Sequence, residues 1–154
     1  MVIEKATRQD AEEILKLQRI AYQSEAERHQ DWSIPPLTES LEDTLAAFDR
    51  QLFLKAFFNH DSRQIVGSVR AHLHEHTCLI GRLIVHPDFQ GKGIGTAMLR
   101  EVEQLFPQAH RFELFTGHKS TRNLSLYQKL GYLPFREQKI SDKLTFIFLE
   151  KTVA

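Results

Sequence analysis

A glycine-rich turn between an apolar strand and an amphipathic helix is the feature that most limits how this chain can fold. The turn, Gln90-Gly91-Lys92-Gly93-Ile94-Gly95-Thr96, follows the apolar run Leu83-Ile84-Val85 and opens the segment Ala97 to Phe106. Glycine tolerates positive φ and lets the backbone approach a bound group closely. The first helical turn adds N–H groups without intrahelical partners and the positive end of the helix dipole. Together they predict a backbone cradle for a phosphate or pyrophosphate.

The spacing of the glycines excludes the two commonest nucleotide-binding loops. The chain has no GxxxxGK[ST] sequence, and glycines at 91, 93 and 95 do not match GxGxxG. A nucleotide-binding regulatory domain that prefers ATP or NAD is therefore disfavoured. For the turn taken alone, a flexible connection that binds nothing stays open as an alternative.

Two segments of the chain share their order and spacing with a known enzyme family. Leu83 to Leu99 contains Gln90-x-x-Gly93-x-Gly95, and Asn123 to Tyr132 ends in Leu-Gly-Tyr. They closely resemble motifs A and B of the GNAT superfamily of acyl-CoA-dependent N-acetyltransferases, most strongly over residues 80–135. The resemblance implies an α+β fold, a twisted mixed β-sheet of about six to seven strands flanked by about four helices. It also implies a single GNAT-like acetyltransferase domain over residues 1–154.

The order of the expected elements agrees with that fold. Apolar patterning predicts strands over residues 2–6, 52–58, 64–73, 77–85, 111–116, 134–140 and 144–150. Helices are expected to begin after Thr7, after Thr38, in the glycine-rich turn and at residue 121. Pro107 should stop the third helix and Gly131 should follow the fourth. Residues 23–38 are expected to be irregular and residues 59–62 to form a turn.

Composition favours a small soluble enzyme in a reducing compartment. The chain has 154 residues, long enough for a sizeable core, and its 42% hydrophobic content argues against disorder. Acidic and basic residues number 20 each, so no charge bias points to nucleic acid or to an acidic membrane. No apolar run approaches the ~20 residues that span a bilayer, and no signal peptide is apparent. Since Cys78 is the single cysteine, we expect a cytoplasmic protein.

The resemblance implies acetyl-CoA as the co-substrate and no metal. The N–H groups of the glycine-rich turn would bind the pyrophosphate, and the pantetheine arm would pair with the preceding strand as an added β-strand. One N–H of that strand would polarise the thioester carbonyl. The family commonly has Asn seven residues before its motif B tyrosine, where this chain has Ser120. The predicted cofactor contacts are Leu83, Ile84, Val85, Gln90, Gly91, Lys92, Gly93, Ile94, Gly95, Thr96, Ser120 and Asn123.

Tyr127 is the predicted general acid, because the family often places a motif B tyrosine near the cofactor sulfur. A phenol with a reference pKa of ~10 is neutral at pH 7 and can protonate a departing thiolate. The reaction implied is direct transfer of an acetyl group to a primary amine in a ternary complex. A core tyrosine on an amphipathic helix is the alternative reading of Tyr127.

The general base is not identified by the sequence. Positions that carry a glutamate in many family members hold Leu79 and Phe115 here. Glu113 shares a strand face with Phe115 and is one candidate. Glu75 and His76 are others, and a water chain or a partly neutral amine would also serve.

Acceptor selection is expected to come from the N-terminal third, as the resemblance implies. The predicted acceptor contacts are Tyr22, Glu25, Asp31 and Trp32. Glu27, Glu39, Glu42 and Asp43 add acidic groups, and Arg28 is the only Lys or Arg between residues 22 and 43. Acidic groups beside aromatic rings favour a cationic small molecule or a peptide amine. Solvated helix faces are the alternative reading of these carboxylates.

Other readings of the chain concern metal binding, turnover and assembly. His72-x-His74-x-His76 lacks a convincing fourth ligand, so a solvent-facing row is expected rather than a metal site. The missing family carboxylates favour a second hypothesis, a sensor or scaffold domain that binds acyl-CoA without turnover. The apolar strand Leu144 to Leu149 either packs internally or contributes to a homodimer.

Overall fold

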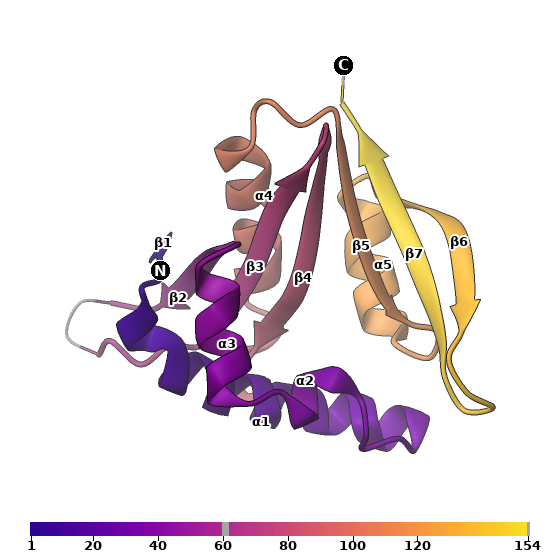
Figure 1. The fold of residues 1–154 in the computed structure, drawn as a ribbon, viewed down its shortest axis with the longest axis horizontal. Helices are drawn as coiled ribbons and strands as arrows, with labels where there is room; N and C mark the ends of the chain where they lie inside the picture. The colour runs from indigo at the N-terminus through magenta and orange to yellow at the C-terminus, as the bar shows by residue number, and fades with distance from the viewer. Residues whose placement is uncertain (60–61, 154) are drawn as a thin grey trace.

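A seven-stranded mixed sheet forms the centre of the computed structural model, which describes residues 1–59 and 62–153 (Figure 1). Its strand order is β1-β2-β3-β4-β5-β7-β6. Only β4 and β5 pair in parallel, and all other neighbours are antiparallel. The predicted α+β class and the GNAT-like mixed sheet are confirmed. The strands are β1 Val2–Lys5, β2 Leu52–Phe57, β3 Gly67–His74, β4 Thr77–Val85, β5 Arg111–Gly117, β6 Leu133–Lys139 and β7 Thr145–Thr152.

Five α-helices flank the sheet within the described residues, one more than the roughly four expected. They are α1 Ala11–His29, α2 Pro35–Thr38, α3 Leu41–Phe48, α4 Ile94–Leu105 and α5 Thr121–Lys129. Short 3-10 turns over Arg8–Asp10 and Pro87–Phe89 precede α1 and the cradle. Figure 1 shows α4 and α5 behind the sheet, with α1, α2 and α3 across its lower front. None of the described helices is long and apolar enough to cross a membrane.

The expectation that residues 23–38 are irregular is wrong. Helix α1 continues to His29 and ends where Gln30 adopts a left-handed φ of 53°. Pro35 then starts the short α2, whose Pro36 carbonyl accepts a hydrogen bond from the Gln18 side chain of α1 at 2.9 Å. This contact between segments distant in sequence is invisible to local periodicity.

Turn and cap positions depart from expectation in smaller ways. Ser40, not Thr38, caps α3, because its hydroxyl accepts from the Asp43 N–H at 3.0 Å. Gly131 follows α5 with a φ of 98°, in the left-handed region that glycine favours. Of the turn predicted over 59–62, residues 60 and 61 lie outside the described residues.

Side chains that alternate across the strands bury two apolar clusters, one on each face of the sheet. Leu54 of β2 packs with Met98 and Val102 of α4. Its neighbour Phe53 points the other way, into a cluster with Ile14 and Leu17 of α1. This alternation is the period-2 pattern of a strand. It fixes α1 and α4 on opposite faces and so positions both helices relative to β4.

Strands β4 and β5 separate soon after they begin. Their parallel pairing covers only Thr77 to Leu79 against Arg111 to Glu113. A β-bulge lies further along β4, where Arg70 and Ser68 of β3 oppose Gly81 and Ile84. Bulges bend a strand and increase its twist. The second half of β4 therefore diverges from β5, and the two leave a gap in the middle of the sheet.

Candidate functional site

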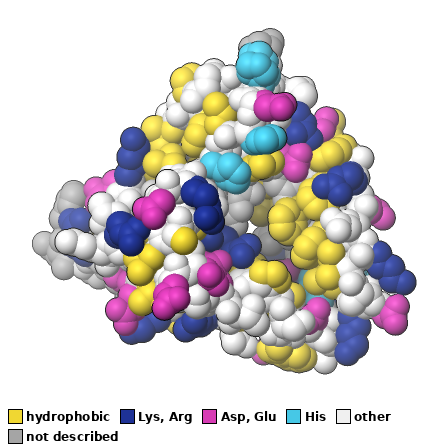
Figure 2. All heavy atoms as spheres, viewed as in Figure 1, with side chains coloured by type: hydrophobic (Ala, Val, Ile, Leu, Met, Phe, Trp, Pro, Cys, Tyr) yellow, Lys and Arg dark blue, Asp and Glu magenta, His cyan; other side chains and the backbone are white. Residues whose placement is uncertain are grey.

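A cavity of about 450 Å³ occupies the opening between β4 and β5. Its walls are residues 80–85 of β4 and 114–117 of β5, and it extends from the glycine-rich turn to α1 and α5. Figure 2 shows this hollow in the middle of the face, with Lys and Arg side chains on one side and hydrophobic side chains on the other. The sequence-predicted motifs A and B meet at this cavity.

The glycine-rich turn presents a row of N–H groups at one end of the cavity. Gly91 and Gly93 have φ of 77° and 81°, which glycine adopts without strain. Within the described residues, no protein group accepts a hydrogen bond from the N–H groups of 91–96, and the first bond of the turn is Ala97 N–H to Gly93 O at 3.0 Å. Free N–H groups at the start of α4 fit an anion such as a pyrophosphate.

Arg122 adds a cation to this cradle that sequence reasoning missed. It lies at the start of α5, donates to Gln90 Oε1 at 2.9 Å, and lines the cavity. Its Nη2 lies 3.6 Å from where a Cβ on Gly91 would be. Lys92, the predicted cation, is not in the cavity wall, and its Nζ is 5.8 Å from the centre of the Phe58 ring. Its position as a basic residue in the first turn of the motif B helix could have identified Arg122 from the sequence.

The strand predicted to bind the pantetheine arm borders the cavity. Leu83, Ile84 and Val85 all line the cavity. Beyond Leu79 the edge of β4 that faces β5 has no pairing strand. That edge can therefore accept an extended ligand by backbone hydrogen bonds.

Tyr127, a buried residue, contributes a hydroxyl to the cavity. The residue is 4% exposed and lines the cavity from α5. No hydrogen bond from its hydroxyl to another described residue is present in the structure. Burial raises the pKa of Tyr127, and the nearby Tyr22 and Glu25 raise it further. The phenol is therefore protonated at neutral pH.

Glu25 is the carboxylate of the cavity wall. It pairs with Arg28 at 2.5 Å, and Ser120 Oγ donates a hydrogen bond to it. His29 supports the same turn of α1: its Nε2 accepts from the Lys119 N–H at 3.2 Å and its Nδ1 lies 3.0 Å from the Glu25 carbonyl. Ser120 is 1% exposed and lies outside the cavity lining, so it contacts Glu25 instead of facing the cavity.

The remaining predicted contacts divide between the cavity and the surface. Tyr22 and Asn123 line the cavity, and Asn123 Nδ2 donates to Thr116 Oγ1 at 3.3 Å. Asp31 and Trp32 do not line it. Asp31 accepts from Ser33 at 2.6 Å and Trp32 is 50% exposed, because the end of α1 at Gln30 directs this segment outward.

The general-base candidates from the sequence are not in the cavity wall either. Glu113 pairs with Arg111 at 2.8 Å at the point where β4 and β5 part, and neither Glu75 nor His76 reaches the lining. The His76 ring stacks on His110 at 4.6 Å. Among the described residues, no group of three or more His, Cys, Asp or Glu side chains could hold a metal ion.

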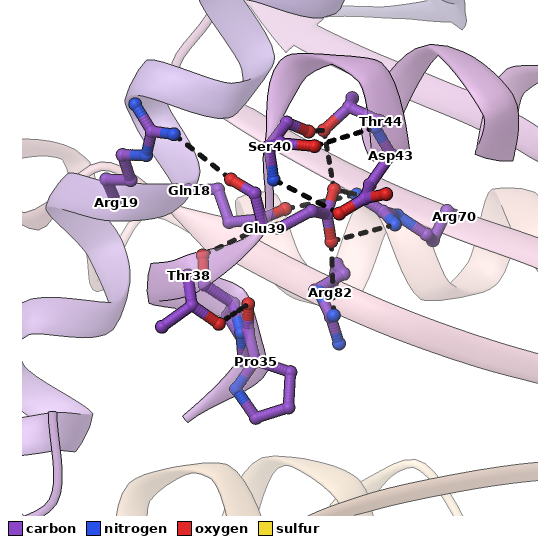
Figure 3. Close-up of polar contacts among 11 residues, drawn as sticks. Gln18, Arg19, Pro35, Thr38, Glu39, Ser40, Asp43, Thr44, Arg70 and Arg82 are labelled. Carbon is purple, nitrogen blue, oxygen red and sulfur yellow. Dashed lines mark hydrogen bonds and ion pairs between the residues drawn. The ribbon is translucent and has the colours of Figure 1, made fainter. Parts of the chain in front are cut away.

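Two arginines, Arg70 of β3 and Arg82 of β4, contact the same carboxylate, that of Glu39 (Figure 3), and Arg82 also lines the cavity. Glu39 contacts Arg70 at 3.0 Å and Arg82 at 3.1 Å, and accepts from Thr44 at 2.6 Å. Burial alone would raise the pKa of Glu39, but hydrogen bonds from Arg70 and Thr44 and the charge of Arg82 lower it to about 2. The acidic N-terminal segment therefore contacts two further arginines, from β3 and β4, that its own sequence does not contain.

The comparisons with known proteins agree with this geometry. The sequence model of the Acetyltransferase (GNAT) family matches residues 11–132. The chain belongs to this family. It is 33% identical over 122 residues to the UPF0157 protein YqkA of Bacillus subtilis, which covers 79% of the chain and 34% of that relative. The chain therefore spans about a third of this relative's length.

Solved GNAT structures share the whole fold. The ribosomal-protein-S18-alanine N-acetyltransferase of Escherichia coli superposes with a TM-score of 0.79 at 15% identity, over 99% of this chain and 94% of that one. The PaiA N-acetyltransferase of Thermoplasma acidophilum, solved in complex with coenzyme A, gives 0.77 at 20% identity over 99% and 100%. At these identities the likeness shows the fold alone.

Proposed function

We propose that this GNAT protein is an N-acetyltransferase that transfers an acetyl group from acetyl-CoA directly to a primary amine. One observation carries the proposal: the free N–H groups of 91–96 and the hydroxyl of Tyr127 open into the same cavity. An anion cradle and an acid on one cavity are what a phosphorylated thioester substrate requires. The GNAT membership and the coenzyme A complex of the Thermoplasma relative support it.

The residues of the cradle fit coenzyme A. Gly91 to Thr96 would hold the pyrophosphate through backbone N–H groups, with Arg122 supplying charge. The unpaired edge of Leu83 to Val85 would hold the pantetheine arm. An N–H of that edge is the proposed donor to the thioester oxygen, an interaction worth roughly 3–4 kcal/mol in other enzymes.

Two side chains are proposed to handle the protons. The amine nitrogen attacks the thioester carbon, the C–N bond forms and the C–S bond breaks. Glu25 accepts the proton that the amine loses, and Tyr127 gives its hydroxyl proton to the departing sulfur. Solvent then takes the proton from Glu25 and gives one to Tyr127, which returns both groups to their starting forms. Glu25 takes this role because it is the carboxylate of the cavity wall and its charge acts on Tyr127.

The test is acetyl-CoA turnover against polyamines, aminoglycosides, amino acids and short peptides, with the acetylated product detected by mass. Detection by mass keeps the Cys78 thiol from interfering. Turnover on one class supports the proposal and names the acceptor class. Tight acetyl-CoA binding without transfer to any amine would favour the sensor hypothesis, and ATP or NAD displacing coenzyme A would favour a nucleotide-binding domain. The single-domain organisation, the cytoplasmic location and the homodimer stay predictions.

A further inference from the structure

The acceptor end of the cavity has more positive than negative charge. Arg70 and Arg82 share one carboxylate, that of Glu39. Of the other side chains bonded to this cluster, Gln18 and Thr44 are neutral, and Arg19, which donates to the Glu39 backbone carbonyl at 3.0 Å, is exposed. Without Arg19, the cluster therefore has a formal charge of plus one in a largely buried place, where an uncompensated charge is costly. The pair of Glu25 and Arg28 nearby is itself neutral, so it does not compensate the cluster.

Arg82 is the member of the cluster that faces the cavity. Its side chain is 23% exposed and lines the cavity, whereas that of Arg70 is 8% exposed and does not. Only Nη2 of Arg82 donates to a described residue, Glu39. Its Nε is buried without an acceptor, and its Nη1, which also has none, is not buried. The guanidinium thus retains hydrogen-bonding capacity toward the cavity.

The backbone at Arg82 has a positive φ, which helps to direct its side chain toward the cavity. Its φ is 50°, in the left-handed region that residues other than glycine rarely adopt. It sits in the β4 bulge between Gly81 and Ile84. Bulges re-aim side chains near functional sites, and strained residues cluster there. The ion pair with Glu39 then fixes the redirected side chain.

We propose that Arg82 binds an anionic group of the acceptor, a carboxylate in the first instance, while the amine of the same molecule lies toward Glu25. This inference rests on the proposed function and narrows its acceptor class to amines that carry an anion, such as amino acids. Tyr22 lines the same cavity as Arg82 and Glu25. Burial raises the pKa of Tyr22, and the charges of Arg82 and Glu25 act on it in opposite directions. The cationic acceptor expected from the sequence would instead face a net positive charge.

Binding of matched ligand pairs tests the proposal without depending on turnover. The probes are N-acetyl amino acids and their primary amides, which differ only in the anion, titrated by calorimetry into the full chain saturated with coenzyme A. We expect at least one carboxylate to bind about tenfold or more tightly than its amide, as a charge-assisted hydrogen bond predicts. Equal affinity within every pair, or no binding by any carboxylate, would overturn the proposal.

Variants then assign the preference to Arg82. Arg82→Gln should bring the carboxylate-to-amide ratio close to one. Arg8→Gln is the matched control, because it removes an exposed arginine that pairs with Asp49 away from the cavity, and it should keep the wild-type ratio. A preference unchanged in Arg82→Gln would also refute the assignment. If Arg82→Gln fails to fold, the ligand pairs on the wild-type chain still decide.

The outcomes separate this inference from the proposed function. Turnover of amino acid amides, with no preference for the free carboxylates, would contradict the anion site and support the acetyltransferase function. A strong carboxylate preference without any acetyl transfer would contradict the proposed acetyltransferase function and support the anion site.

Discussion

Replacement of Tyr127 by Phe is expected to impair chemistry while leaving the fold intact. The substitution deletes one hydroxyl from a buried ring that faces the cavity. Since no described residue bonds to that hydroxyl, its removal leaves no polar group without a partner. We therefore expect the free energy of unfolding to change by about 0.5 kcal/mol or less, equivalent to about 1–2 °C in Tm.

The expected loss of activity is much larger than the loss of stability. A positioned general acid contributes typically 10²–10⁴-fold to rate. A hundredfold fall in kcat corresponds to about 3 kcal/mol of transition-state stabilisation. Because the pyrophosphate cradle is elsewhere in the cavity, the Kd for acetyl-CoA should stay within about threefold of wild type. The assay combines initial rates by product mass, acetyl-CoA titration by calorimetry and thermal unfolding.

Tyr132→Phe is the matched control for this experiment. Tyr132 is fully buried, does not line the cavity, and donates to Glu103 at 3.0 Å. Loss of a hydrogen bond to this partly buried carboxylate should cost about 1–3 kcal/mol of stability and leave kcat unchanged. A fall in kcat of less than threefold for Tyr127→Phe would refute the acid role, and a fall that tracks a lower Tm would make Tyr127 structural.

Three further predictions follow from the same structure. Gly93→Ala should weaken acetyl-CoA binding several-fold in calorimetry, because alanine is strained at a φ of 81° although its Cβ would meet no atom within 4 Å. Gly117→Ala should lower the free energy of unfolding by about 2 kcal/mol, because its Cβ would overlap the buried His29 ring. The control is Gly81→Ala, whose Cβ would meet no atom within 4 Å and which should cost less than half as much. Denaturant titration measures both changes. Glu39 has a folded pKa of about 2 against an ordinary 4.5, so it stabilises the protein above pH 4.5 by about 3 kcal/mol, and this contribution is lost as pH falls from 4.5 to 2. Chemical denaturation of wild type and Glu39→Gln across that range should show the difference between them shrinking.

Local patterns in the sequence were enough to predict the sheet and the cradle. Strand alternation and the glycine-rich turn depend on neighbours in sequence, and β4 and the start of α4 lie where they were expected. Gly91 and Gly93 indeed have positive φ. The cavity also brings the motif A strand and Tyr127 together, as the motif order implied.

The acceptor end could not be predicted because it depends on contacts between distant segments. Arg70 and Arg82 come from the middle of the chain, and only the fold places them against Glu39. The β4 bulge that turns Arg82 inward has no local sequence signal other than Gly81. Asp31 and Trp32 were assigned because the resemblance implies acceptor contacts in their segment and because they are acidic and aromatic, but the end of α1 directs them away from the cavity.

Because β4 and β5 pair over only a few residues, the sheet consists of two parts joined by a short stretch of strand pairing. Within the described residues, the only strand pairing between β1 to β4 and the group of β5, β7 and β6 is that of Thr77 to Leu79 with Arg111 to Glu113. A ligand lying along the open edge of β4 would substitute for the missing rungs between them. Its binding free energy would then add to the cohesion of the whole sheet. The gap between β4 and β5 is therefore also the place where two neighbouring strands of the sheet have the fewest paired residues.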